Sequence, residues 1–105
     1  MKEDTTQGME RLREELPELM ESFAGMHDAV LREGALSVKT KRLIMLGASV
    51  AIRCEPCIRV HARGALEAGA SRAEILEAAS AGIVMGGGPS AAYTSLYLMD
   101  ELNQE

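Results

Sequence analysis

The stretch RCEPCIRVHARGALEAG, residues 53–69, decides the fold, because it carries both the start and the end of a helix. Pro56 suits the first turn of a helix, since proline lacks the backbone N–H that this turn leaves unpaired. Gly69 suits the position after the last turn, since glycine readily adopts the left-handed conformation that ends helices. We therefore predict a helix from Pro56 to Ala68, with a pair of cysteines at its beginning.

Two helices are predicted before this segment. Pro17 opens the first and Gly34 ends it. Its apolar residues recur at helical spacing: Leu16, Met20, Phe23, His27, Val30 and Leu31. Ser37 is a suitable N-cap for the second helix. From residue 43 to residue 52 this helix is apolar on nearly every side, so we expect it to be central and buried.

Two more helices are predicted after the segment. Ser71-Arg72-Ala73-Glu74 is a capping box, which starts a helix that runs to about Met85. The break Gly86-Gly87-Gly88-Pro89 separates it from a last helix over residues 90–103. No segment of useful length alternates between polar and apolar residues, as a half-exposed strand would. The prediction is an all-α chain of five or six helices.

The composition supports a single small helical domain. Of the 105 residues, 47% are hydrophobic and 26% are charged, which is typical of a globular rather than a disordered chain. Aromatic residues make up only 3%, so the core must be built from aliphatic side chains and methionine. We divide the chain into a polar N-terminal segment, residues 1–15, whose later residues can join a short helix, and a helical domain, residues 16–105.

Charge and hydropathy argue against several classes of function. The formal net charge of −5 disfavours nucleic-acid binding, which needs clustered Lys and Arg. The longest apolar run, residues 43–52, is about half of what a membrane-spanning helix requires. Residues 2–18 are rich in charge and do not resemble a secretion signal. We therefore expect the protein to lie in the cytoplasm, a compartment in which structural disulfides are rare.

The segment Arg53–His61 carries the candidate chemistry. Two cysteines three residues apart can close a disulfide at a helix start, and Cys57 would lie near the positive end of that helix. A helix N-terminus and nearby arginines, here Arg53 and Arg59, increase the thiolate fraction of a cysteine. Cys57 and His61 are four residues apart, which places both on one helix face. A thiol beside an imidazole is a nucleophile beside its base, so we interpret Cys54, Cys57 and His61 as a redox site.

Two other interpretations of these residues are open. In the first, both cysteines and His61 are packed residues without chemistry. In the second, Cys54, Cys57 and His61 bind zinc, which prefers four ligands and would have to take His27 as the fourth. His27 lies on the apolar face of the first predicted helix, where a packed histidine is the commoner case. We predict no metal and no cofactor.

The chain also resembles a known family. The stretch Leu36–Ile44, the pattern Arg53-Cys54-x-x-Cys57-x-x-x-His61, the stretch Gly69–Ile75 and the Gly86-Gly87 break are similar to the AhpD-like / carboxymuconolactone decarboxylase family. The resemblance covers residues 30–90, and its Cys-x-x-Cys-x-x-x-His core is specific. It implies an all-helical fold that assembles as a homotrimer or homohexamer.

Within this family, the alkylhydroperoxidase branch uses the two cysteines and the histidine as its active site. The resemblance implies that Cys57 attacks the peroxide, Cys54 is the resolving thiol, and His61 belongs to a proton relay. The sequence differs from this branch at two positions. Arg42 stands where the branch has a glutamate that completes the relay, and a guanidinium cannot accept a proton at neutral pH. Pro56 stands where the best-characterised members have a histidine.

The predicted function is that of a thiol-dependent peroxidase or disulfide oxidoreductase acting on a hydroperoxide. An external dithiol, for example a lipoylated protein, would reduce the Cys54–Cys57 disulfide. Two alternatives remain: a decarboxylase acting on a carboxylated lactone, and a non-enzymatic, oligomeric redox sensor. The decarboxylases of the family lack the cysteine pair, whereas the absence of the relay glutamate favours a sensor.

Overall fold

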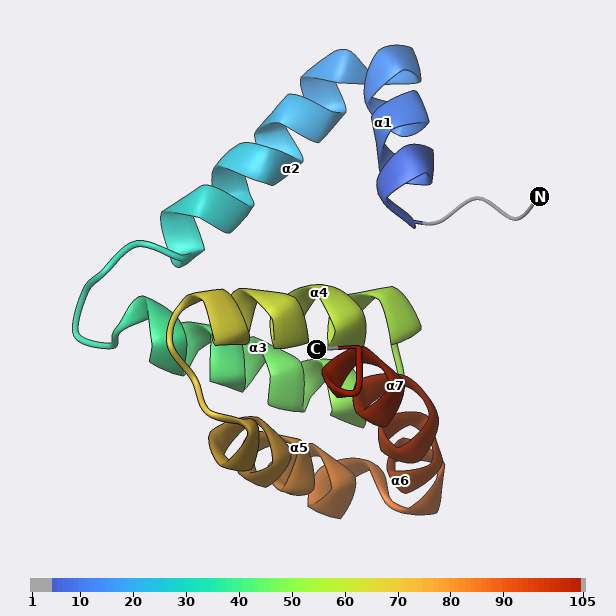
Figure 1. The fold of residues 1–105 in the computed structure, drawn as a ribbon. Coiled ribbons are helices and arrows are strands. Elements are labelled where there is room, and N and C mark those ends of the chain that lie inside the picture. The colour runs from blue at the N-terminus through green and yellow to red at the C-terminus, as the bar shows by residue number, and fades with distance from the viewer. Residues whose placement is uncertain (1–4, 105) are drawn as a thin grey trace. The chain divides into compact units, whose positions relative to one another are not determined.

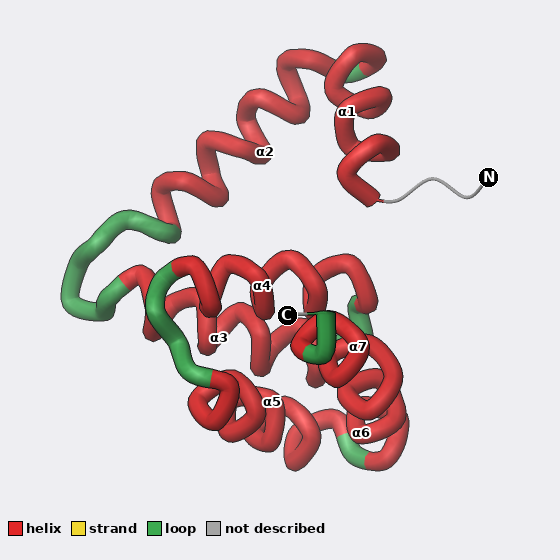
Figure 2. The backbone as a smooth tube through the Cα atoms, in the orientation of Figure 1, coloured by secondary structure: helices red, strands yellow, loops and turns green. Residues whose placement is uncertain are grey.

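The described part of the chain, residues 5–104 of a computed structural model, contains helices and loops but no strand (Figure 2). The predicted all-α class is confirmed for these residues. The chain divides into two units, Met1–Arg32 and Glu33–Glu105. Of the helices in the described part, none is long and apolar enough to cross a membrane.

The first unit is a pair of helices, α1 (Thr5–Glu15) and α2 (Pro17–Val30). Pro17 opens α2 as predicted. α1 extends over all of the predicted polar segment that the structure describes, and is longer than the short helix expected there. The boundary predicted between residues 15 and 16 falls between α1 and α2, while residues 1–4 of the polar segment lie outside the described residues.

The second unit holds the remaining helices. α3 spans Val38–Ala51, α4 spans Glu55–Glu67 and α5 spans Arg72–Gly86. A last continuous helix is composed of α6 (Gly88–Tyr93), the π-helical turn η1 (Thr94–Leu98) and α7 (Met99–Leu102). Counted in this way, the described residues form six helices, within the predicted five or six.

Local signals account for most of the helix ends. Ser37 caps α3, where its hydroxyl accepts a hydrogen bond from the backbone N–H of Thr40 at 3.0 Å. Ser71 and Glu74 form the predicted capping box at the start of α5, with both reciprocal hydrogen bonds present. Gly69 has a φ of 97°, the left-handed conformation predicted after the preceding helix. These ends depend only on neighbouring residues, which is why the sequence predicts them well.

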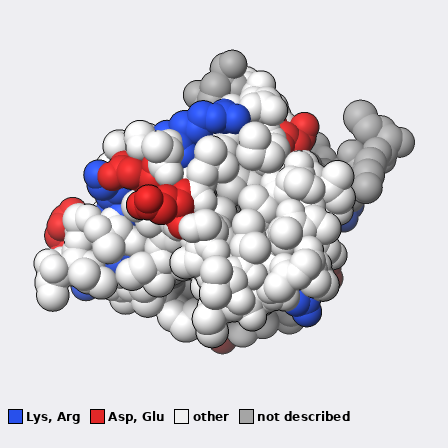
Figure 3. Space-filling view, turned by 90° about the horizontal axis from the view of Figure 1, so that it is seen from below, with Lys and Arg blue, Asp and Glu red and all other residues white. Residues whose placement is uncertain are grey.

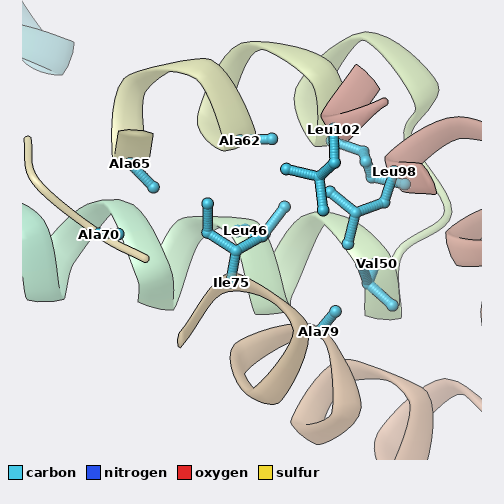
Figure 4. Close-up of a cluster of buried hydrophobic side chains, with 10 residues drawn as sticks. Leu46, Val50, Ala62, Ala65, Ala70, Ile75, Ala79, Leu98 and Leu102 are labelled. Atoms are coloured by element: carbon cyan, nitrogen blue, oxygen red, sulfur yellow. The ribbon is translucent and has the colours of Figure 1, made fainter. Parts of the chain in front are cut away.

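α3 is the central helix of the second unit, as its apolar sequence predicts. Figure 1 shows α4 along one side of α3 and α5 along the other. The core between them is aliphatic (Figure 4) and consists of Leu46, Val50, Ile58, Ala62, Ala65, Ala70, Ile75, Ala79, Leu98 and Leu102. Tyr93 and Tyr97 are only partly buried against it. The predicted aliphatic core is therefore confirmed for this unit.

The basic first turn of α3 is compensated by the first turn of α5. The ammonium nitrogen of Lys39 lies 3.2 Å from Oε2 of Glu74. Oε1 of Glu74 accepts a hydrogen bond from the Ser71 N–H at 2.9 Å. This backbone N–H, and after it the Lys39 side chain, lower the pKa of the Glu74 carboxyl below its ordinary value. A single carboxylate therefore caps α5 and links it to α3.

Glu74→Gln is expected to destabilise the fold at neutral pH, with a difference from the wild type that disappears on acidification. A carboxyl whose pKa is lowered in the folded state stabilises that state above its unfolded pKa, about 4.3 for Glu. This stabilisation is lost as the pH falls through the lower, folded pKa. Urea unfolding of both proteins at several pH values measures the difference. Glu77→Gln, an exposed change on the same helix, is the control, and a difference that persists in strong acid would disprove the linkage.

Candidate active site

The two cysteines lie at the start of α4 and are joined by a disulfide, with their Cα atoms 5.3 Å apart. Cys54 is the N-cap of α4, and its sulfur accepts a hydrogen bond from the Cys57 N–H at 3.3 Å. The helix begins at Glu55, one residue before the predicted start at Pro56. Both cysteines are half-buried. The predicted pair thus meets at the positive end of a helix dipole, where thiolates are stabilised.

A left-handed backbone conformation at Arg53 places Cys54 at the N-cap of α4. Arg53 has a φ of 58°, which is uncommon for residues other than glycine. The Cys54 N–H donates a hydrogen bond to the Ser49 carbonyl at 3.1 Å and so anchors the turn to the last part of α3. The chain can therefore leave α3 and enter α4 within residues 52–54.

His61 lies one helical turn beyond Cys57 on α4 and is only 8% exposed. Its Nδ1 atom is 3.0 Å from Nη1 of Arg42, which reaches across from α3. A guanidinium has donors and no acceptor, so the arginine donates and Nδ1 accepts. The structure thus pairs a predicted site residue with the cation that replaces the relay glutamate of the alkylhydroperoxidase branch.

Arg59 belongs to a different cluster, which links α4 to the last helix. Its guanidinium contacts three carboxylates: Glu55 at 3.1 Å, Asp100 at 2.8 Å and Glu101 at 3.2 Å. The hydrogen bond to Asp100 is the main cause that raises the pKa of Arg59 above its ordinary value. Three carboxylates therefore compensate the charge of Arg59, which the sequence suggests as a group that stabilises the thiolate.

Glu101 is the buried member of this cluster. It is 9% exposed, and it pairs with both Arg59 and Arg63, the latter at 3.3 Å. The Arg59 guanidinium also lies 5.7 Å from the ring centre of Tyr97 in η1. The cluster therefore holds α4, which carries the cysteines, against the C-terminal helix of the unit.

The residues of the zinc interpretation belong to two different units of the chain. No group of three or more His, Cys, Asp or Glu there could hold a metal ion. His27 lies in the first unit, half-buried beside Phe23, with the two ring centres 5.9 Å apart. Cys54 and Cys57 are half-buried rather than core residues, which also weighs against the interpretation as inert packing.

Comparison with known proteins places the chain in a family. Residues 17–100 match the model of the Carboxymuconolactone decarboxylase family. The chain belongs to this family. The predicted resemblance is therefore confirmed, and its Cys-x-x-Cys pair with a nearby histidine is consistent with the AhpD-like members.

Solved structures of this family are similar over most of the chain. A carboxymuconolactone decarboxylase family protein from Legionella pneumophila, solved in the apo form, is 37% identical with a TM-score of 0.85, over 93% of this chain and 88% of that one. A family protein from Thermotoga maritima, for which involvement in the antioxidative response has been suggested, is 36% identical with a TM-score of 0.73, over 80% and 87%. An uncharacterised protein of Cupriavidus necator is 36% identical over 83% of this chain and 79% of its own.

The sequence does not reveal Arg42 as a partner of His61. It indicates only a cation at the position where the resemblance implies a glutamate. A signal was nevertheless present: Arg42, Leu46 and Val50 follow at intervals of four on α3, and the latter two are fully buried. An arginine on the buried face of a central helix needs a partner, and His61 is that partner in α4.

Proposed function

We propose that the chain is a thiol-dependent oxidoreductase that cycles between a Cys54/Cys57 dithiol and the disulfide. The observation that carries the proposal is the Cys54–Cys57 disulfide at the start of α4, with His61 one turn further along the same helix. A helix N-terminus is a site where thiolates are stabilised and become nucleophilic. The half-burial of both sulfur-bearing residues leaves room for a substrate to approach.

In the proposed cycle, the Cys57 thiolate attacks one oxygen of a hydroperoxide. The O–O bond breaks, the leaving oxygen takes a proton and departs as an alcohol or water, and Cys57 becomes a sulfenic acid. The Cys54 thiol then attacks the sulfenic sulfur, so that a disulfide forms and water leaves. An external dithiol reduces this disulfide in two exchange steps and becomes a disulfide itself. We take that dithiol to be a lipoylated protein and the compartment to be the cytoplasm.

Hydroperoxide consumption by the reduced protein, with dihydrolipoamide as the reductant, tests this function. Sustained turnover that disappears when the thiols are blocked is the expected result. A single oxidation to the disulfide without turnover would instead identify a redox sensor. Consumption of a carboxylated lactone that is unaffected by thiol blocking would identify a decarboxylase and disprove the proposal.

We also propose that copies of the chain assemble as a homotrimer or homohexamer through the face shared by α3 and α5. An apolar groove of about 430 Å³ lies there, lined by residues that include Ile44, Gly47 and Met85. Met85 and its neighbour Val84 are each 81% exposed. Figure 3, which views the molecule from the α5 side, shows a broad surface without charged residues. Exposed apolar surface of this kind is typical of interfaces, and a second copy supplies a face of the same chemistry.

Sedimentation velocity is expected to give the mass of three or six chains at micromolar concentration. Val84→Glu should shift the distribution toward smaller species, because it places a charge on the apolar face. The control is Glu77→Gln on the same helix, which should leave the mass unchanged. A wild-type protein that sediments as a stable monomer would contradict the proposed assembly.

A further inference from the structure

Helix α2 carries an apolar stripe, the α2 stripe, that the structure leaves exposed. Its members recur at alternating intervals of three and four residues, and their exposed fractions lie between 44% and 59%: Leu16, Leu19, Phe23, Met26 and Val30. Among the described residues of α1 and α2, only Met20 is buried, and it falls outside this spacing. Alternating intervals of three and four keep side chains on one narrow face, which is the pattern of a helix that packs lengthwise against another helical surface.

Two helices of this length need such a surface. α1 has 11 residues and α2 has 14, and isolated helices shorter than about 12–15 residues are marginal in water. Most of the stability of a helix in a protein comes from the packing of its apolar face. Because the burial of Met20 accounts for only a small part of that face, we expect a partner surface to cover the α2 stripe.

The apolar groove between α3 and α5, the α3/α5 groove, has a complementary shape and chemistry. Its volume is about 430 Å³, and Ile44 and Met85, which line it, are exposed. Much of the remaining lining consists of small residues, three from each helix: Gly47, Ala48, Ala51, Ala78, Ala81 and Gly82. Large side chains that project from one helix pack into the depressions that small residues leave between others. The groove can therefore receive the leucine, phenylalanine and methionine side chains of the α2 stripe.

The helices that carry the two apolar surfaces have opposite charges. α2 contains three acidic residues and no lysine or arginine: Glu18, Glu21 and Asp28. α3 contains three basic residues and no acidic residue: Lys39, Lys41 and Arg42. α5 adds one basic residue and two acidic ones: Arg72, Glu74 and Glu77. Contact of α2 with the groove, whose helices together are net basic, is therefore favoured, whereas contact of α2 with α2 would bring like charges together.

We infer that the α2 stripe of one copy lies in the α3/α5 groove of a second copy. This inference rests on the proposed assembly through the face of α3 and α5, for which it names the surface that the second copy supplies. The two surfaces in contact differ, so each copy gives its α2 to one neighbour and receives α2 from another. Head-to-tail contacts close into a ring when the rotation between copies allows it, as in a trimer or in each half of a hexamer.

Cross-linking between two differently substituted copies tests this contact. Ser22→Cys places a thiol beside the middle of the α2 stripe, and Ala48→Cys places one in the groove; both residues are small and exposed. Both variants also carry Cys54→Ser and Cys57→Ser, so that the new thiol is the only one in each chain. The two chains are co-expressed with different tags and treated with a short bismaleimide. A covalent pair that contains both tags is the expected product, and it should be absent when either variant is expressed alone.

Each other outcome overturns the inference. Cross-linking of Ser22→Cys with itself alone would show that α2 packs against α2. Cross-linking of Ala48→Cys with itself alone would show that two grooves face each other. A chain that carries both substitutions and cross-links only within itself would show that α2 covers the groove of its own copy. No product in any combination would show that the two surfaces do not meet.

Sedimentation velocity of variants that keep Cys54 and Cys57 gives a second, independent measurement. Phe23→Glu, in the middle of the α2 stripe, should shift the mass toward single chains. Gly25→Glu adds the same charge off the stripe, where an added side chain meets open space, and should leave the mass unchanged. If Val84→Glu dissociates the assembly and Phe23→Glu does not, the assembly through α3 and α5 holds and the inference about α2 is wrong. A wild-type monomer instead contradicts the assembly itself, and neither result depends on turnover.

Discussion

Cys57→Ser is expected to reduce dithiol-dependent turnover to background, a loss of at least roughly a thousandfold, as when a covalent nucleophile is removed. Cys54→Ser should also lower turnover, but at a different step, since the external dithiol must then reduce the sulfenic acid without Cys54. It should leave Cys57 able to undergo one oxidation to the sulfenic acid, because only the resolving thiol is missing. Mass spectrometry after one equivalent of hydroperoxide distinguishes the two variants, which turnover alone does not.

The hydrogen bond at the start of α4 favours this order of attack. The Cys57 N–H donates a hydrogen bond to the Cys54 sulfur at 3.3 Å, so Cys54 is the side-chain acceptor at the N-cap of α4. When an external dithiol attacks the Cys57 sulfur, Cys54 leaves as a thiolate that this N–H can stabilise. Cys54→Ser keeps a side-chain acceptor at the N-cap, so the start of the helix should remain folded.

When a monothiol replaces the dithiol, a mixed disulfide should accumulate on Cys57 in the Cys54→Ser variant, because neither Cys54 nor a second thiol of the reductant is present to resolve it. The opposite order, with Cys54 as the attacking thiol, is known from proline-containing Cys-x-x-Cys pairs of thioredoxin type. If limiting alkylation is lost only in Cys54→Ser, and the mixed disulfide forms only in Cys57→Ser, the assignment of the two cysteines must be reversed. The proposed cycle between dithiol and disulfide would still hold after that outcome, because it needs both cysteines in either order of attack.

The elements that the sequence predicts best are those whose causes are local. Ser37, Gly69 and the box from Ser71 to Glu74 each act on backbone groups within a few residues, and each is present in the structure. The cysteine pair is also local, because a helix start brings residues three apart together. Family membership could be predicted for a similar reason, since the most specific part of its pattern, Cys54-x-x-Cys57-x-x-x-His61, lies within one turn and one helix.

The features that the sequence does not reveal depend on contacts between helices. Nothing around Arg53 indicates a left-handed φ, which the connection from α3 to α4 imposes. The π-helical turn Thr94–Leu98 lies inside a segment whose residues fit an ordinary helix. The contact between Arg42 and His61 joins α3 to α4 across Gly64, which periodicity alone does not report.

Leu46→Ala is expected to lower the free energy of unfolding by about 2–5 kcal/mol, the usual range for a buried leucine. Leu46 is fully buried in the centre of α3, and its removal leaves a cavity among side chains that cannot close fully. Leu96→Ala makes the same chemical change at a side chain that is 61% exposed, and should cost within about 0.5 kcal/mol. Urea unfolding of both variants, followed by circular dichroism, gives the comparison. Equal losses would contradict the core assignment.

The loss of unfolding free energy in Leu46→Ala also indicates whether α3, which carries Arg42, can shift to fill a cavity in the core. Leu46 lies one turn beyond Arg42 on the same face of α3. If α3 shifts to fill the cavity, the loss of stability should lie near the lower end of the range, because collapse reduces the cavity term. The Arg42 guanidinium would then also move relative to His61 on α4, which it contacts at 3.0 Å. If α3 stays in place, the loss should approach the upper end, and the contact between Arg42 and His61 should be kept.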